Sequence, residues 1–263
     1  MLTITDARKT FFPGTVNEKP ALRDITLHLA PGDFATIIGS NGAGKSTLLN
    51  AISGTLPLDA GSIQIDGIVV NRMNDHRRAR FIGRVFQDPS AGTAPSLTIQ
   101  ENMAIALRRG QRRGLGWGVT SARKARFRDE LATLELGLEN RLTAKVGLLS
   151  GGQRQALSLL MATFTQPNIL LLDEHTAALD PQRAELVTRL TQSVVHQHGL
   201  TTLMVTHNME QALRVGNRLI MMHDGQVILE LDADQKKTTT VPDLLREFEK
   251  IKGATLDDRT LLS

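Results

Sequence analysis

Residues 34–47 read FATIIGSNGAGKST, a continuous apolar run followed directly by a glycine-rich loop. The apolar run predicts a strand that is buried on both faces, and residues 48–52 predict a helix. The loop fits the pattern G-x-x-x-x-G-K-[S/T], in which glycines let successive backbone N–H groups turn toward phosphate oxygens. Lys45 is expected to reach the β- and γ-phosphates, and the Ser46 hydroxyl is expected to bind Mg²⁺. Nucleotide contacts are expected from the whole loop: Gly39, Ser40, Asn41, Gly42, Ala43, Gly44, Lys45, Ser46 and Thr47.

A second buried strand ends in two carboxylates. The apolar residues 169–172 are followed by Asp173 and Glu174. A P-loop needs a second Mg²⁺ ligand, and Asp173 meets that need directly or through water. Glu174 is expected to polarise a water molecule for in-line attack on the γ-phosphate, with a solvated strand-end carboxylate as the alternative. The two motifs predict a nucleotide with Mg²⁺ and leave GTPase, kinase and ATPase open.

Composition narrows the class of protein. A length of 263 residues suits one or two domains, and the absence of cysteine excludes disulfides, thiolate-bound iron–sulfur clusters and thiol nucleophiles. No apolar run approaches the ~20 residues of a membrane-spanning helix, and no secretory signal is visible. We therefore expect a soluble, cytoplasmic chain for which any membrane role depends on a partner.

The formal net charge of +4 is unevenly distributed. Residues 108–128 contain no acidic side chain, and such a segment indicates a solvated surface, a face near lipid headgroups or a nucleic-acid site. Because Trp117 is the one tryptophan and tyrosine is absent, the aromatic platforms of single-strand binders are nearly missing, and no nucleic-acid partner is expected. The basic side chains of this segment are Arg108, Arg109, Arg112, Arg113, Arg123, Lys124, Arg126 and Arg128.

The order of the apolar patterns predicts an α/β fold with a P-loop. Strands and helices alternate on both sides of a helical stretch at about 88–164, which predicts a mainly parallel sheet with a helical subdomain inserted into it. An antiparallel β subdomain is expected at the N-terminus and a hairpin around Asp224-Gly225. We expect one domain over residues 1–232 and a polar tail over residues 233–263 with one short helix, at 241–251.

The pentapeptide Leu149-Ser150-Gly151-Gly152-Gln153 precedes a predicted helix. With it the chain resembles the ATP-binding cassette (ABC) ATPases over roughly residues 1–232, which implies a P-loop fold of the ABC type. Further motifs follow in the family's order. Gln87 matches the Q-loop glutamine, Asp180 matches the D-loop aspartate, and His207 matches the switch histidine.

The resemblance implies a head-to-tail dimer. Each ATP would lie between the P-loop of one copy and the signature residues of the other, namely Ser150, Gly151, Gly152 and Gln153. In that arrangement Glu174 hydrolyses ATP, His207 contacts the γ-phosphate, and Asp180 follows the dimer seam. Gln87 binds Mg²⁺ and links it, with the attacking water, to the helical insertion.

Two positions depart from the family's pattern. His175 stands where the family has proline, and because residues 176–181 follow normally we interpret it as a lineage variant and not as a new catalytic group. Phe12 stands at the adenine-stacking position in place of tyrosine. Stacking survives that change, and Phe11 is the alternative stacking residue.

The resemblance favours the ATPase subunit of a membrane transporter. The single cassette is most similar to those of bacterial importers that use a solute-binding protein, and the DEHT sequence at 173–176 is similar to a group linked to amino-acid uptake. The expected partners are a second copy of the chain or a paralogous ATPase, transmembrane permease subunits and, indirectly, a solute-binding protein. We expect residues 88–98 to help form a groove for a permease helix, at the cytoplasmic face of the inner or plasma membrane. The alternative is a soluble single-cassette ATPase of the iron–sulfur assembly type.

Overall fold

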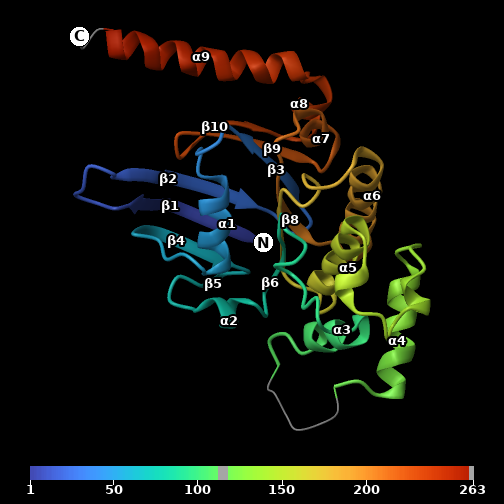
Figure 1. The fold of residues 1–263 in the computed structure, drawn as a ribbon. Coiled ribbons are helices and arrows are strands. Elements are labelled where there is room, and N and C mark those ends of the chain that lie inside the picture. Colours follow the sequence, from blue (N-terminus) through green and yellow to red (C-terminus); the bar gives the residue numbers. More distant parts are fainter. Residues whose placement is uncertain (112–117, 261–263) are drawn as a thin grey trace.

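The strands form two sheets in a computed structural model, which describes residues 1–111 and 118–260, with side chains described up to residue 250 (Figure 1). The larger sheet has the order β10-β9-β3-β8-β7-β6, and all its neighbours are parallel except β9 and β10. The mainly parallel sheet and the hairpin are therefore as expected. Its strands are β3 (Phe34–Gly39), β6 (Ile82–Val85), β7 (Ile169–Asp173), β8 (Thr201–Val205), β9 (Arg218–His223) and β10 (Gln226–Leu231).

The smaller sheet is antiparallel and has the order β2-β1-β4-β5. Its strands are β1 (Leu2–Phe11), β2 (Lys19–Leu29), β4 (Ala60–Ile65) and β5 (Ile68–Val69). Every second residue at the end of β2, from Ile25 to Leu29, is buried, as the pleat of a half-covered strand requires. These residues pack with the buried face of α1 (Lys45–Ser53) and with one face of the larger sheet in a single apolar core. The predicted α/β fold is confirmed.

Helices cover the other face of the larger sheet. Along β7, Ile169 and Leu171 belong to the core around α1, whereas Leu170 and Leu172 belong to a second core with α5 (Gly151–Thr163) and α6 (Pro181–His198). Alternate side chains of a strand point to opposite faces, so the sheet is covered on both sides. This explains why the strand is apolar from Ile169 to Leu172.

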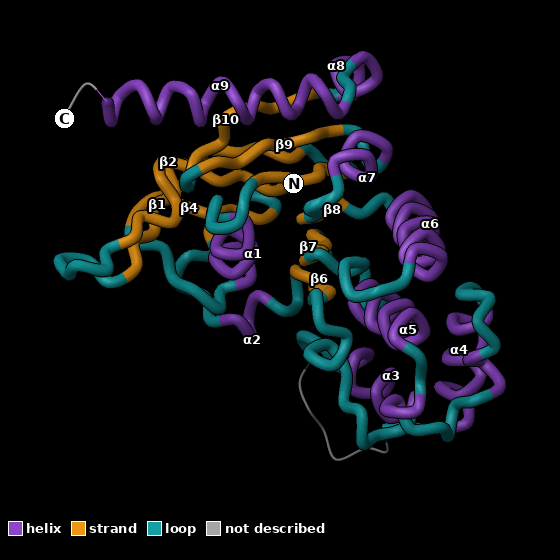
Figure 2. Tube along the Cα trace, turned by 45° about the horizontal axis from the view of Figure 1, so that its top comes forward, coloured by secondary structure: helices purple, strands orange, loops and turns teal. Residues whose placement is uncertain are grey.

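A group of helices lies between β6 and β7 in the sequence, and beyond α5, which packs on the sheet, its other members lie away from the strands (Figure 2). Its members have their own apolar core, in which Phe127 and Phe164 make an edge-to-face contact with ring centroids 5.8 Å apart. Arg112, Arg113 and Trp117 lie outside the described residues. The helices before and within this stretch are α2 (Asp75–Arg78), α3 (Ile99–Leu107), α4 (Ser121–Ala132) and α5, with 3-10 turns at Leu138–Asn140 and Val146–Leu148.

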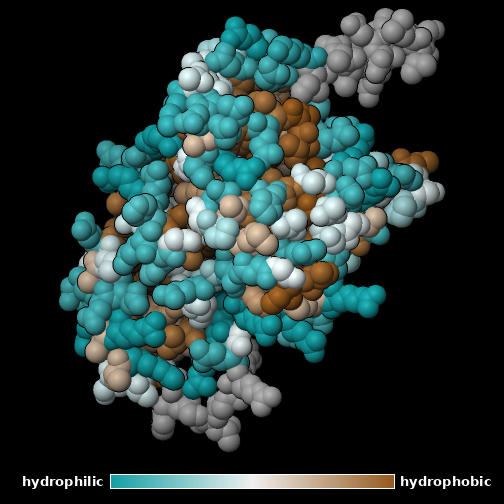
Figure 3. Space-filling model, turned by 180° about the vertical axis from the view of Figure 1, so that it is seen from behind, coloured by the Kyte–Doolittle hydropathy of each residue, from teal (hydrophilic) through white to brown (hydrophobic). Residues whose placement is uncertain are grey.

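The C-terminal segment differs from the expected polar tail with one short helix. It forms α8 (Ala233–Thr238) and α9 (Val241–Thr260), next to α7 (Met209–Arg214). Leu244 of α9 is fully buried in an apolar cluster with residues of α7, β9 and β10, a contact that its sparse apolar pattern did not reveal. From behind, most of the surface is hydrophilic, and an apolar area lies below the C-terminal helix (Figure 3). Among the described helices, none is long and apolar enough to cross a membrane.

Candidate nucleotide-binding site

The glycine-rich loop turns sharply between β3 and α1. Gly42 and Gly44 have φ values of +83° and +98°, a region that residues with a Cβ rarely adopt. A Cβ on Gly44 would lie 2.4 Å from the carbonyl oxygen of Ala21, so the loop packs directly against β2. The sequence pattern is thus explained by close backbone packing as well as by conformational freedom.

Lys45 is held across the loop that precedes it. Its side-chain Nζ donates hydrogen bonds to the carbonyl oxygens of Gly39, at 2.7 Å, and Ser40, at 3.1 Å. Burial lowers the pKa of the Lys45 amine, while the carboxylates of Glu174 and Asp173 raise it and partly offset that effect. The side chain is 7% exposed, so its ammonium group lies within the loop and is largely shielded from solvent.

The loop borders a cavity of about 240 Å³. Its lining contributes the features that phosphate groups and Mg²⁺ need, since the loop backbone and two lysine amines suit an anion and the Ser46 and Glu174 oxygens suit a hard cation. The residues present therefore fit ATP with Mg²⁺. The lining residues are Phe11, Lys19, Ala21, Asn41, Gly42, Ala43, Gly44, Lys45, Ser46, Thr47 and Glu174.

The aromatic residue at the cavity differs from the one expected. Phe11, the last residue of β1, belongs to the described lining of the cavity, and Phe12 does not. Phe12 begins the turn after the strand with a φ of +52° and is 66% exposed. Because Phe12 leaves the strand in a left-handed conformation, the chain turns there and only Phe11 keeps its place beside the loop.

Asp173 and Glu174 lie at the carboxyl end of β7, as predicted. Asp173 accepts a hydrogen bond from the Arg84 guanidinium at 3.0 Å, and Arg84 also donates to the Asn50 side chain at 2.8 Å. The sequence analysis missed Arg84. Its signal was a charged residue between Gly83 and Val85 in an otherwise apolar strand, because such a position needs a buried partner.

The register of β7 against β8 brings Glu174 and His207 together. Asp173 pairs with Val205, so the residues that follow the two strands leave the sheet at the same edge. The nearest atoms, Glu174 Oε2 and His207 Nδ1, are 3.6 Å apart, and the His207 side chain is 64% exposed. Glu174 has a φ of +43°, which turns the chain sharply after the strand.

A buried amide connects the segments that carry these two residues. Gln211 of α7 accepts a hydrogen bond from the Thr206 hydroxyl at 2.7 Å. Its Nε2 donates to the hydroxyls of Thr188, at 2.9 Å, and Thr176, at 3.4 Å. One side chain thus links α6 to the residues just beyond Glu174 and just before His207. No sequence motif identified Gln211, because its partners are distant in the chain.

His175 is buried, with an exposure of 2%. Its Nε2 lies 3.0 Å from the Thr191 hydroxyl, which donates its own hydrogen to the Val187 carbonyl at 2.8 Å, so Nε2 is the donor and carries the proton. Burial lowers the pKa of the imidazole to about 4, and Nδ1 is enclosed without a partner among the described residues. The ring is therefore neutral near pH 7 and faces α6.

Gln87 and the signature residues lie outside the cavity lining. Gln87 is exposed just beyond β6, where Gln155 of α5 donates to the carbonyl oxygen of Phe86 at 3.0 Å. Ser150 caps α5, because its hydroxyl accepts from the Gln153 backbone at 3.3 Å.

The signature glycines pack beside the D-loop of the same copy. Leu179 approaches Gly151, and Arg183 approaches Gly152 closely enough to leave little room for a Cβ. Asp180 caps α6 by accepting from the Arg183 backbone at 3.1 Å and is itself exposed. Within the described part of the chain, residues 150–153 and Asp180 do not reach the cavity of their own copy.

Known proteins resemble the chain over most of its length. A family model described as "ABC transporter" matches residues 22–177. A tyrosine transport ATP-binding protein of Clostridioides difficile is 42% identical over 250 residues, covering 95% of this chain and 99% of that protein. An aliphatic sulfonates import ATP-binding protein of Agrobacterium fabrum is 36% identical over 213 residues, which cover 81% of this chain and 74% of that protein.

Solved structures agree with this assignment. A dimeric ATP-binding cassette in a post-hydrolysis state, bound to ADP and Pi, has a TM-score of 0.75 and 32% identity, covering 89% of this chain and 99% of that chain. The ADP conformation of another cassette from an ABC transporter has a TM-score of 0.78 and 25% identity, covering 94% and 98%. The chain belongs to the ATP-binding subunits of the ABC transporter family and is an ATPase whose cofactors are ATP and Mg²⁺.

Proposed function

We propose that this chain is the ATP-hydrolysing subunit of an importer for a small solute of the amino-acid type. The observation that carries the ATPase chemistry is the convergence of Lys45 and Glu174 on one cavity, with Asp173 at the same edge of the sheet. Lys45 and the loop hold the phosphates, Ser46 and Asp173 hold Mg²⁺ with help from Gln87, and Glu174 takes a proton from the attacking water. His207 contacts the γ-phosphate.

A second copy of the chain, or a paralogous ATPase, completes each site. The described lining of the cavity contains no signature residue, although Ser150 to Gln153 begin a helix whose N-terminus favours an anion. Asp180 is exposed beside them and lies at the seam of the proposed head-to-tail dimer. The similarity to a dimeric cassette supports this arrangement.

Phe11 contacts the adenine in this proposal, in place of Phe12. Phe11 borders the same cavity as the phosphate loop and gives the base an apolar face, whereas Phe12 projects into solvent. The turn after β1 keeps the two side chains apart.

The chain acts from the cytoplasmic face of the membrane through separate permease subunits and, indirectly, a solute-binding protein. Residues 1–232 form the ATPase domain, with the helical subdomain over about 88–164, and residues 233–263 follow as a C-terminal segment. The amino-acid type is supported by the relative named for tyrosine transport, which the chain matches almost from end to end.

Glu174→Gln tests the ATPase mechanism. The variant keeps the shape of the side chain and removes the base, so turnover falls roughly 10²- to 10⁴-fold while ATP binding and an ATP-bound dimer persist. Phosphate release and size-exclusion chromatography measure the two effects, and the exposed Glu249→Gln on α9 is the matched control. Hydrolysis by Glu174→Gln at the parent rate contradicts the assignment of the base.

Copurification and uptake test the transporter assignment. The tagged chain, isolated from detergent-solubilised membranes of its native host, is expected to retain a multi-span protein in stoichiometric amount. Cells that lack the chain are expected to lose uptake of labelled tyrosine or another amino acid, and Glu174→Gln is expected not to restore it. If only a soluble partner copurifies, under all detergent and salt conditions, the transporter hypothesis is wrong and the alternative of a soluble assembly-type ATPase is favoured.

A further inference from the structure

We propose that Lys19 is a second phosphate-binding cation of the nucleotide site, which contacts the phosphate chain of ATP in addition to Lys45. The inference rests on the proposed function and deepens it, because it adds a charged residue of the antiparallel sheet to a site whose other charges come from the phosphate loop and β7. It follows from the register of β1 against β2, from the short distance between the Lys19 amine and the loop, and from the lack of a partner for that amine among the described residues.

The register of two strands places Lys19 at the cavity. Phe11, the last residue of β1, pairs directly with Lys19, the first residue of β2. Residues that lie opposite each other in an antiparallel pair project from the same face of the sheet, so the Lys19 side chain leaves β2 on the side of the Phe11 ring. Ala21, two residues further along β2, lies on that face as well, and all three residues line the cavity. The backbone pairing that holds Phe11 therefore also fixes the position of Lys19.

The amine of Lys19 lies against the phosphate loop. Its Nζ is 3.2 Å from the point that a Cβ on Gly42 would occupy, so the missing side chain of Gly42 leaves room for the amine. Gly42 belongs to the stretch whose backbone N–H groups suit a bound anion. An ammonium group beside such N–H groups adds a charge-assisted hydrogen bond to the same anion. Lys19 is therefore placed to bind phosphate oxygens together with the loop.

The charge of Lys19 is not neutralised by the described part of the chain. Its amine has no hydrogen bond or ion pair with a described residue, and its side chain is exposed. The neighbouring Glu18 is engaged elsewhere, because its carboxylate accepts a hydrogen bond from the Gly14 backbone at 2.6 Å. Lys45 differs, since two carbonyl oxygens hold its amine and the strand-end carboxylates act on its charge. The Lys19 cation is thus available to a ligand that enters the cavity.

The lining of the cavity carries an excess of positive charge. Lys19 and Lys45 are its cations among the described lining residues, and Glu174 is its carboxylate. A polyphosphate brings several negative charges into this small space, and each cation at short range strengthens its binding. The ligand that fits is a nucleoside polyphosphate, with its base on Phe11 and its phosphates between the loop and Lys19.

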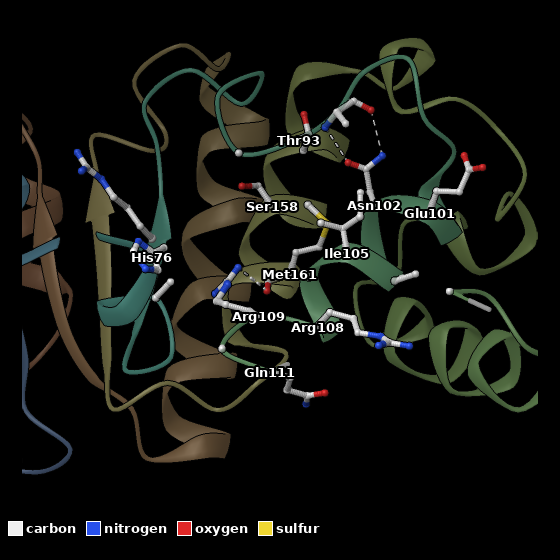
Figure 4. Close-up of a pocket in the computed structure, with 18 of the residues that line it drawn as sticks. His76, Thr93, Glu101, Asn102, Ile105, Arg108, Arg109, Gln111, Ser158 and Met161 are labelled. Atoms are coloured by element: carbon white, nitrogen blue, oxygen red, sulfur yellow. Dashed lines mark hydrogen bonds between the residues drawn. The ribbon is translucent and has the colours of Figure 1, made fainter. Parts of the chain in front are cut away.

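Other unpaired cations of the molecule lie in a different setting. Arg77 and Arg108 have no side-chain hydrogen bond or ion pair with any residue that the structure describes, and both line a groove between α2 and α3, the α2–α3 groove. This groove has a volume of about 1570 Å³, and Figure 4 shows His76 on one side of it and Arg108 on the other. It includes part of the segment 88–98, for which a permease helix is expected, and its described lining contains no residue of the phosphate loop. Of these three unpaired cations, Lys19 is the one at the nucleotide cavity.

Isothermal titration of the full chain with ATP and with inorganic triphosphate tests the inference, with EDTA present so that ATP is not hydrolysed. Lys19→Gln removes the charge from an exposed side chain, so the affinity for both ligands is expected to fall roughly fivefold at low salt. The loss is expected to shrink at high salt, because ions screen an exposed charge. Lys19→Arg is expected to keep most of the affinity. Lys124→Gln on α4 is the matched control, since it removes a lysine charge outside the cavity lining and is expected to bind both ligands like the parent.

The two ligands separate a phosphate contact from other effects. Unchanged affinity of Lys19→Gln for inorganic triphosphate overturns the inference and leaves the proposed function intact. A loss confined to ATP assigns the amine to the ribose or the base and overturns the phosphate contact as well. Equal losses in Lys19→Gln and Lys124→Gln show a general effect of net charge, which also overturns it. If the parent chain binds no ATP, the proposed function and the inference fail together.

Discussion

The ATP cavity and the α2–α3 groove differ in size and in the groups that line them. The cavity is small, most of its lining residues belong to the phosphate loop, and its main cation, Lys45, is fixed by two carbonyl oxygens. The groove is more than six times larger in volume, its charges are carried by long side chains, and two of those side chains have no partner in the described chain. The first arrangement is preorganised for a ligand that is always the same. The second can adjust to the surface of a protein partner.

The difference predicts which changes each site tolerates. Backbone packed against backbone, as at Gly44 and Ala21, cannot move away from an added methyl group, whereas exposed arginines can be replaced at little cost to the fold. The substitutions below therefore act on the cavity, or on the buried side chains that support it, and are expected to leave the groove and its partner unaffected.

Gly44→Ala is expected to have the largest effect. The new Cβ would lie 2.4 Å from the Ala21 carbonyl oxygen at a φ of +98°, and relief of that overlap displaces the loop. Steric overlap and backbone strain together cost about 3 kcal/mol, which corresponds to a loss of roughly a hundredfold in ATP affinity. A fluorescent ATP analogue measures the affinity. Gly32→Ala is the control, because its φ is +81° but nothing lies within 4 Å of the new Cβ. Equal losses in the two variants contradict the role of close packing.

The same distinction explains what the sequence revealed. The phosphate loop could be predicted because all its features lie within nine consecutive residues, and strand-end acids such as Asp173 follow from a local apolar pattern. The sequence indicated only the 88–98 side of the groove, because Arg77 lies on α2 and Arg108 lies just after α3. The basic run from Arg108 to Arg128 suggests one surface in the sequence, yet Arg109 binds the end of α5 and Arg126 lies over the Phe164 ring.

The helical tail illustrates a second limit of sequence reasoning. Only a few apolar residues of the segment, chiefly Leu244 and Phe248, pack on the rest of the fold, so its sequence predicts a polar tail. Lys236 adds a contact that no periodicity encodes, since its buried amine donates to the carbonyl oxygens of Val215 and Gly216. Tertiary contacts of this kind decide the structure of a segment with weak local signals.

His175 is expected to make stability depend on pH. Its pKa is about 4 in the folded chain and near 6.5 when unfolded, so the unfolded chain binds an additional proton between these values. The free energy of unfolding contributed by the neutral imidazole is fully present above pH 6.5 and is lost as the pH falls toward 4. The loss between pH 7 and pH 5 is about 2 kcal/mol.

Urea denaturation at several pH values measures this effect. The His175→Asn variant lacks the titration, so its stability is expected to decline less than that of the parent between pH 7 and pH 5. The exposed His198→Asn, at the end of α6, is the control and is expected to follow the parent curve. Parallel curves for the parent and His175→Asn contradict the burial of an uncharged ring.

Gln211→Leu is expected to have a smaller effect on catalysis. The amide connects the segments of Glu174 and His207, so its loss relaxes their 3.6 Å separation without altering the phosphate loop. We expect kcat to fall roughly tenfold because the catalytic geometry loosens, while KM for ATP stays unchanged. Steady-state phosphate release separates the two constants, and the exposed Gln197→Leu on α6 is the control. A rise in KM with kcat unchanged indicates instead that the phosphate loop itself has moved.

Phe11→Ala is expected to have the smallest effect, because the adenine contact is a single face of one ring. Removing it costs about 1 kcal/mol, or roughly a fivefold loss of ATP affinity, and leaves kcat unchanged since the phosphates are held elsewhere. The adjacent Phe12→Ala is a matched control, for the same ring is deleted from a side chain that is 66% exposed. Isothermal titration with ATP and with inorganic triphosphate separates the base from the phosphates, so the Phe11→Ala loss should appear for ATP alone. A larger loss of ATP affinity for Phe12→Ala would mean that the exposed turn after β1 folds over the nucleotide. The aromatic contact would then form only when ATP binds, unlike the contacts of the phosphate loop, which are in place beforehand.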